Sequence, residues 1–295
     1  MENKAAVFIL LGQSNAVGHG VPMKDEDKIT TPLKNVFGLS REKNQSFKNT
    51  SLEWEGYKSA GMNLAEEQDD TYSVANLLAK HWQSSIDAGN ELPDLHIIQI
   101  AIGAQGATKG FMWHPEYERV LVPGKLGTVK IALTPYTEHI LSLVPQSLEV
   151  LGKTLEYIGI HWRGSEDDAN AQWDELKDNC KNTLFEIFSR FQNALKKKVP
   201  VILHRRVSED RSLDRDPSGE GVKKLRYINE IFEKLVEENK EYEMFDVREC
   251  PLYIPNVRGN GVFIEDVVHF TPEANMWVAQ KIMDDYINNQ LSKNI

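Results

Sequence analysis

A serine near the start of this chain and a histidine–aspartate pair near its end stand in settings that suit covalent chemistry. Residues 7–11 are an apolar, strand-like run that ends in Gly12-Gln13-Ser14-Asn15. A serine where a buried strand turns into a loop is open to a substrate carbonyl, and such turns leave backbone N–H groups unpaired. Asp266 and His269 precede a helix start near the C-terminus. A hydroxyl, an imidazole and a carboxylate are the groups that nucleophilic acyl transfer needs.

Each of the three residue types has a distinct chemical task. A serine hydroxyl is a poor nucleophile until a base removes its proton. Histidine is the base whose pKa ordinarily lies near neutrality. An aspartate three residues before it, on a tight loop, can fold back onto one ring nitrogen and fix the tautomer. The sequence therefore predicts Ser14 as nucleophile, His269 as general base and Asp266 as its orienting carboxylate.

Two further strand ends carry residues that suit the same site. Gly103-Ala104-Gln105-Gly106 follows a predicted strand at 96–102, and Arg163-Gly164-Ser165-Glu166 follows one at 157–161. Sites in open α/β sheets lie beyond the carboxyl ends of the strands, so these segments should meet Ser14. Gly103 has no side chain, which lets a substrate approach its amide closely.

The order of elements along the chain predicts an α/β protein. Continuous apolar runs of strand length alternate with amphipathic helical patterns, as right-handed crossovers between parallel strands require. We expect a three-layer α/β/α sandwich with a flavodoxin-like parallel sheet of about five strands, and one domain over residues 1–295 with an irregular insertion at about 20–70. Strands are predicted at 7–11, 35–39, 96–102, 157–161, 199–203 and 244–247, and helices at 71–86, 135–144, 174–195, 221–238 and from 271 onward.

Composition excludes several classes of function. With 41% hydrophobic and 26% charged residues the chain has the balance of a folded protein. Its formal net charge of −10 argues against a nucleic-acid partner, which would need a basic face. No signal-peptide pattern or transmembrane stretch is visible, so we expect a cytoplasmic protein with no membrane partner. The two cysteines, Cys180 and Cys250, form no disulfide framework and are expected to be ordinary thiols.

The glycines and histidines give no sign of a cofactor or a metal. Gly103, Gly106 and Gly110 match neither the dinucleotide-binding pattern nor the phosphate-binding P-loop. No pair of histidines flanks a glutamate at helical zinc-site spacing. We therefore expect neither a cofactor nor a bound metal.

Taken in order, the four blocks resemble those of the SGNH (GDSL-like) hydrolases, and more closely the sialate O-acetylesterase-like carbohydrate esterases, whose first motif is Gly-Gln-Ser-Asn. The resemblance spans nearly the whole chain. It implies the SGNH hydrolase fold and a Ser14, His269 and Asp266 triad. It also implies an oxyanion hole that includes the backbone N–H groups of Ser14 and Gly103.

The third block departs from that family. The esterases usually have Trp-x-Gln-Gly-Glu-x-Asp, whereas this chain has Arg163 in place of the glutamine and Ser165 in place of the glutamate. Arg163 is expected to project into the cleft, because it ends a strand at the site. Three roles are open to it: a donor to the oxyanion hole, a grip on an acidic substrate group, or a salt bridge to Glu166 or Asp167.

The expected function is that of a serine esterase that removes an acyl group, most simply acetyl, from a carbohydrate hydroxyl. The expected partner is a small-molecule or glycan acyl ester. Gln13, Asn15, Gln105 and Trp113 are the expected substrate-binding residues; Trp113 could stack on a sugar or could pack its own loop. Two alternatives remain: a non-catalytic glycan-binding module on the same fold, and an esterase or thioesterase for small non-sugar substrates.

Overall fold

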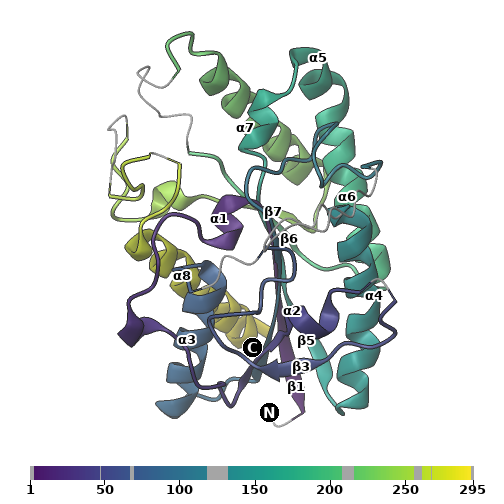
Figure 1. Cartoon of the computed structure of the whole chain (residues 1–295), viewed down its shortest axis with the longest axis vertical. Helices are drawn as coiled ribbons and strands as arrows, with labels where there is room; N and C mark the ends of the chain where they lie inside the picture. Colours follow the sequence, from purple (N-terminus) through teal and green to yellow (C-terminus); the bar gives the residue numbers. More distant parts are fainter. Residues whose placement is uncertain are drawn as a thin grey trace.

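A twisted sheet runs through the middle of the molecule, with helices on both sides (Figure 1). The computed structural model describes residues 3–46, 48–66, 70–117, 132–207, 216–255, 261–266 and 268–293. No helix in these ranges has both the length and the apolar character needed to cross a membrane.

Seven strands form the sheet in the order β3-β2-β4-β1-β5-β6-β7. All neighbouring strands are parallel except β2 and β3, which are antiparallel. Their bounds are β1 Lys4–Gly12, β2 Val36–Leu39, β3 Trp54–Gly56, β4 Asp94–Ala101, β5 Thr154–Arg163, β6 Val201–His204 and β7 Tyr242–Phe245.

The prediction of about five strands was too low. The described sheet has seven: each of the six predicted strand segments, β7 included, enters it, and β3 at Trp54–Gly56 adds an antiparallel edge strand that the sequence did not indicate. Three residues are too few to show an alternation of apolar and polar side chains, so the sequence does not indicate β3. The strand forms because it pairs with β2. Both short edge strands belong to the segments where the sequence signal was weakest.

The residues of β1 alternate between two cores, which makes the fold three-layered. Val7, Ile9 and Leu11 pack into one core, whereas Phe8 and Leu10 pack into the other. Successive strand side chains point to opposite faces, so a run that is apolar at every position must be covered on both sides. The continuous apolar run at 7–11 correctly predicted this.

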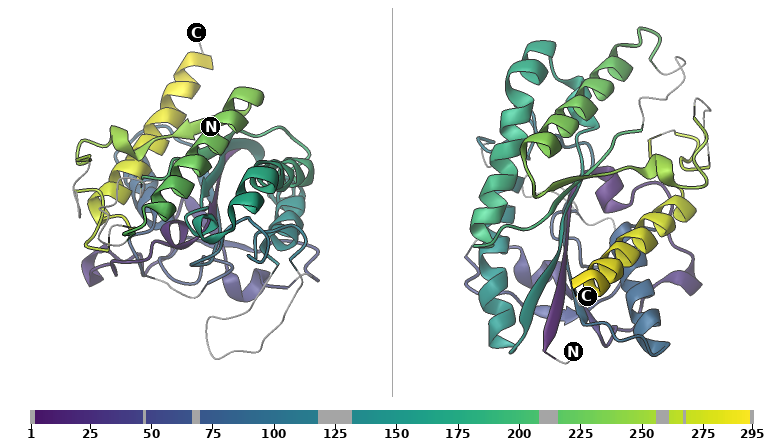
Figure 2. Two further views of the ribbon diagram at one scale, coloured as in Figure 1. Left: turned by 90° about the horizontal axis from the view of Figure 1, so that it is seen from above. Right: turned by 180° about the vertical axis from the view of Figure 1, so that it is seen from behind.

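Helices cover each face of the sheet, as the view from behind shows (Figure 2). Helices α4, α6 and α7 pack with the first core, and α3 and α8 with the second. The long helices are α3 Val74–Asp87, α4 Leu133–Val150, α6 Lys181–Ala194, α7 Glu220–Glu238 and α8 Pro272–Lys293. The shorter ones are α1 Ser14–Val17, η1 Asp25–Asp27, α2 Arg41–Asn44, η2 Asp167–Asn170, α5 Trp173–Glu175, η3 Leu176–Cys180 and η5 Val247–Glu249.

The last helix begins where its capping signal predicts. The Thr271 hydroxyl accepts a hydrogen bond from the Ala274 N–H at 3.2 Å, and α8 starts at Pro272. The predicted helix at 174–195 is instead α5, a π-helical turn at Leu176–Cys180 and α6. Cys180 and Cys250 are both buried free thiols, as expected.

The region at 20–70 is less irregular than the sequence indicated. It contributes β2, β3 and α2, so part of it extends the sheet rather than standing outside it. Its residues 47 and 67–69 lie outside the described ranges.

Candidate active site

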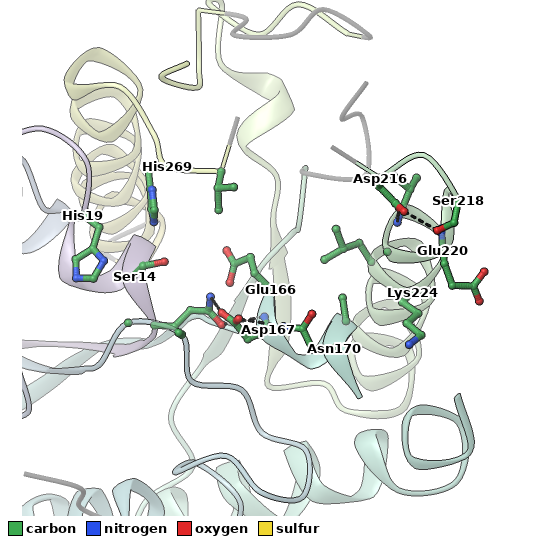
Figure 3. A pocket seen from close by; sticks show the side chains of 18 of the residues that line it. Ser14, His19, Glu166, Asp167, Asn170, Asp216, Ser218, Glu220, Lys224 and His269 are labelled. Atoms are coloured by element: carbon green, nitrogen blue, oxygen red, sulfur yellow. Dashed lines mark hydrogen bonds between the residues drawn. The ribbon is translucent and has the colours of Figure 1, made fainter. Parts of the chain in front are cut away.

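A cavity of about 920 Å³ opens beyond the carboxyl ends of the central strands. Its lining comes from the segments that follow β1, β4 and β5, from the start of α7 and from the loop before α8 (Figure 3). Ser14, Gly103 and His269 all line it. Glu166 lines it as well, so the structure brings together all four blocks that the sequence placed at one site.

Ser14 is the first residue of α1 and follows directly on the end of β1. Gly12 has a φ of 140°, and the Gln13 N–H donates to the Arg163 carbonyl at 3.1 Å, so the chain turns sharply beside β5. The positive φ explains why a glycine precedes the motif. Within the described residues the Ser14 N–H donates to no other group, which leaves it available to a ligand.

Asp266 and His269 form the expected pair. The Asp266 Oδ2 atom lies 2.5 Å from His269 Nδ1, while Oδ1 accepts from the Val268 and His269 N–H groups at 2.9 Å each. Carboxylate oxygens accept, so Nδ1 carries the hydrogen and Nε2 is the free nitrogen of the neutral ring. Figure 3 shows His269 and Ser14 on the same wall of the cavity. Val267, between them in the motif, lies outside the described residues.

Asp266 is held in its ionised form. Burial raises the pKa of this carboxyl, but the His269 and Val268 N–H groups and the His269 ring together outweigh burial, so its pKa lies below the usual value. A carboxylate with a lowered pKa stays charged down to more acidic pH, and it can hold the imidazole throughout the neutral range.

Gly103 lies beside Ser14 because of the strand register. Gly12 of β1 pairs with Ala101 of β4, and each of the two residues lies two positions beyond a member of that pair. The Gly103 N–H donates to Glu66 Oε2 at 2.7 Å, and Glu66 Oε1 lies 3.0 Å from His19 Nε2. His19 and Glu66 were not predicted. His19 follows closely on the serine motif, between Gly18 and Gly20, whereas no local pattern marks Glu66.

Gln13 and Asn15 were expected to bind substrate, but both side chains hold neighbouring loops. The Gln13 amide donates to Asp167 Oδ2 at 2.7 Å. The Asn15 amide donates to Glu166 Oε1 at 3.0 Å and to the Val268 carbonyl at 3.1 Å. Asn15 therefore ties the start of α1 to the loop that carries His269. Gln13 still lines the cavity; Asn15 is 3% exposed and lies behind it.

Trp113 and Gln105 also lie away from the cavity lining. Trp113 is fully buried, its indole N–H donates to the Gly12 carbonyl at 3.0 Å, and its ring packs edge-on against Trp162. Gln105 accepts from the Met112 N–H at 3.0 Å. The structure favours the packing role for Trp113, because a fully buried indole ring has no exposed face on which a sugar could stack.

The Arg163 side chain does not project into the cleft as expected. It is 1% exposed, donates to Asn275 Oδ1 at 3.0 Å and lies over the Phe270 ring. Alternation along β5 is the reason: Trp162 enters the core beneath α6, so its neighbour must face α8. Glu166 pairs instead with Arg206. Burial, with Arg206 nearby, lowers the pKa of Arg163 to about 9.

We expect Arg163→Gln to lower stability and to leave kinetics nearly unchanged. The variant loses a charge-assisted hydrogen bond and a ring contact in the protein interior, which together are worth about 1–3 kcal/mol. Thermal unfolding should show the loss, while kcat/KM for neutral and for acidic esters should each stay within about threefold of the wild-type value. A rise in KM confined to acidic esters would instead place the guanidinium in contact with substrate.

Two buried histidines lie near Arg163. His161 Nδ1 lies 3.1 Å from His204 Nε2, and burial lowers the pKa of His161 to about 3. Both rings are therefore uncharged, as an interior that already holds two arginines requires. Within the described ranges, no cluster of three or more histidine, cysteine or acidic residues could hold a metal ion.

The fold resembles that of proteins whose structures have been solved. No family model and no curated protein matches the chain. The crystal structure of NanS superposes with a TM-score of 0.62 at 12% identity over 98% of this chain and 99% of NanS. A protein from Arabidopsis thaliana superposes with a TM-score of 0.56 at 14% identity, over 98% of this chain and 99% of that protein. Est24, a carbohydrate acetylesterase from Sinorhizobium meliloti, reaches 0.47 at 12% identity over 97% and 99%, which is too weak to support an argument.

These superpositions cover nearly all of each chain, although the identities are too low to transfer an activity. The serine at the end of β1 and the Asp266–His269 pair before α8 lie where the sequence motifs implied. The chain has the fold of NanS.

Proposed function

We propose that this protein is a serine esterase that hydrolyses acyl esters of carbohydrates, with O-acetyl groups as the expected substrate. The observation that carries the proposal is the His269–Asp266 pair, held at 2.5 Å in the same cavity as Ser14. An oriented imidazole beside a serine is the minimum that acyl transfer requires. The acetyl and carbohydrate parts of the proposal rest on the resemblance of the Gly-Gln-Ser-Asn block to carbohydrate esterases.

In the proposed mechanism, His269 Nε2 takes the Ser14 proton as Oγ attacks the ester carbonyl. The tetrahedral oxyanion is stabilised by backbone N–H groups, among them those of Ser14 and Gly103. The leaving alcohol receives the proton from His269, and water then attacks the acyl-enzyme with His269 as base again. Asp266 keeps the ring in the correct tautomer and stabilises it while it is charged.

The second candidate is a non-catalytic glycan-binding module. It is favoured by the position of Arg163, since the side chain that replaces the family glutamine points away from the cavity. Turnover of 4-nitrophenyl acetate that disappears in Ser14→Ala would support the enzyme. Glycan binding without any turnover would support the module.

Deacetylation of acetylated sugars, compared with that of small non-sugar esters, tests the substrate class. The carbohydrate proposal predicts the higher kcat/KM for the acetylated sugars. A preference for short non-sugar esters or thioesters would point to the other esterase class.

We expect Asp266→Asn to lower kcat by about 10- to 1000-fold, less than the roughly 10⁴-fold seen for the equivalent change in serine proteases. The asparagine amide can still accept from the two backbone N–H groups, but as a donor to Nδ1 it favours the wrong tautomer. Steady-state kinetics with 4-nitrophenyl acetate would measure the effect. Unchanged kcat would mean that another group orients His269.

A further inference from the structure

Arg163, one of the donors that the sequence predicted for the oxyanion hole, does not reach the cavity. The family places a glutamine at position 163, whereas Arg163 is buried against Asn275 and Phe270. A tetrahedral oxyanion is stabilised best by more than one preorganised donor. Another side chain of the cavity lining can supply a donor beside the Gly103 N–H.

The Glu66 carboxylate lies between two donors, and each of its oxygens meets one of them. It is an anion that accepts from the Gly103 N–H at 2.7 Å through Oε2, while Oε1 lies 3.0 Å from His19 Nε2. A carboxylate only accepts, so His19 Nε2 carries a hydrogen and donates it. A backbone amide and a ring N–H thus converge on one anionic group inside the cavity.

The His19 ring is held close to the other catalytic groups. Its backbone N–H donates to the Ser14 carbonyl at 2.9 Å, and its ring centroid lies 5.8 Å from that of His269. A Cβ atom at position 103 would lie 2.5 Å from His19 Cε1, so the ring packs directly on the Gly103 backbone. Figure 3 shows His19 next to Ser14 and His269 at the cavity wall.

We propose that His19 is a catalytic residue whose Nε2–H, with the Gly103 N–H, binds the substrate oxyanion at the place that the Glu66 carboxylate occupies in the free protein. The proposal rests on the esterase function above and adds a donor to it. Glu66 stands in for the oxyanion and must leave when the substrate carbonyl enters, because two negative charges at one point repel.

The step balances without any further reactant. The Ser14 Oγ–carbon bond forms as the Oγ proton moves to His269, and the carbonyl π electrons move to the oxygen that His19 and Gly103 bind. The bond to the leaving oxygen then breaks as His269 returns the proton to it. His19 keeps its own proton throughout and acts only as a donor.

Steady-state kinetics of His19→Ala with 4-nitrophenyl acetate tests the proposal. Removing one oxyanion donor should lower kcat by about 10²- to 10³-fold with KM within about threefold. His19→Gln restores an N–H donor and should recover at least about tenfold of that loss. The matched control is His114→Ala. Among the described residues, the His114 ring accepts only a local turn N–H and lies outside the cavity lining.

Glu66→Ala separates the donor role from a structural pairing. Removing the resident carboxylate should raise kcat/KM by up to about tenfold, because the hole no longer has to be vacated. If kcat/KM fell as far in Glu66→Ala as in His19→Ala, the proposal would be overturned. The contact between the two side chains would then support the structure of the site, and His19 would not act as a donor on its own. Wild-type kcat in His19→Ala would also overturn it.

Binding of a trifluoromethyl ketone, which forms a serine hemiketal oxyanion, gives a second readout. Its affinity should fall in His19→Ala by about the same factor as kcat/KM, as transition-state analogues require. Unchanged affinity would overturn the proposal, and if His19→Ala fails to fold, His19→Gln is compared in its place. If wild type and His19→Ala are both inactive, or if Ser14→Ala stays active, the esterase function itself has failed.

Discussion

Ser14→Ala is expected to lose at least about 10⁴-fold in kcat toward 4-nitrophenyl acetate while keeping its fold. The substitution removes only the hydroxyl that we propose forms the acyl-enzyme, and the other donors of the site remain. Circular dichroism and thermal unfolding should match the wild type, because Ser14 makes no side-chain hydrogen bond among the described residues.

Ser142→Ala is the matched control for that experiment. Ser142 is an exposed serine of α4 whose hydroxyl donates to the His139 carbonyl within its own helix. Its kinetics should equal those of the wild type. Activity of Ser14→Ala within about tenfold of wild type would show that another group is the nucleophile.

His269→Ala should show a loss of similar size. Single removal of the serine or of the histidine in a triad costs about as much as removal of all three groups, because they act as one unit. We expect a fluorophosphonate probe to label Ser14 in the wild type and to label it at least about 10³-fold more slowly in the variant.

Added imidazole provides the decisive check. The variant leaves a space beside Asp266 that a free imidazole can enter, so labelling should recover in part as imidazole is added. Ser14→Ala should not recover under the same conditions. Labelling of His269→Ala at the wild-type rate without imidazole would exclude this histidine as the base.

The strong local patterns of the sequence were enough to predict the main elements. The apolar run of β1 required cover on both faces, and Thr271 and Pro272 placed the start of α8. The contact between Asp266 and His269 could also be predicted from the sequence, because a carboxylate three residues before a histidine on a tight loop can reach its ring. These features depend on neighbours in the chain, and sequence contains that information.

The side-chain partners of the site were decided only by the tertiary structure. Strand alternation turns Arg163 toward α8, so its side chain does not enter the cleft as expected. Core packing encloses Trp113, which decides between the two roles that the sequence left open for it. Asn15 holds the histidine loop through contacts more than 150 residues away.

Glu66 is the clearest case of a role that sequence alone could not give. No pattern around it predicts that its carboxylate meets Gly103 and His19, which come from two other segments of the chain. The sequence determined which strands end at the cavity and predicted which groups would carry the chemistry. The packing of the sheet against its two helical layers decided which side chains reach the cavity, because that choice depends on contacts between distant segments.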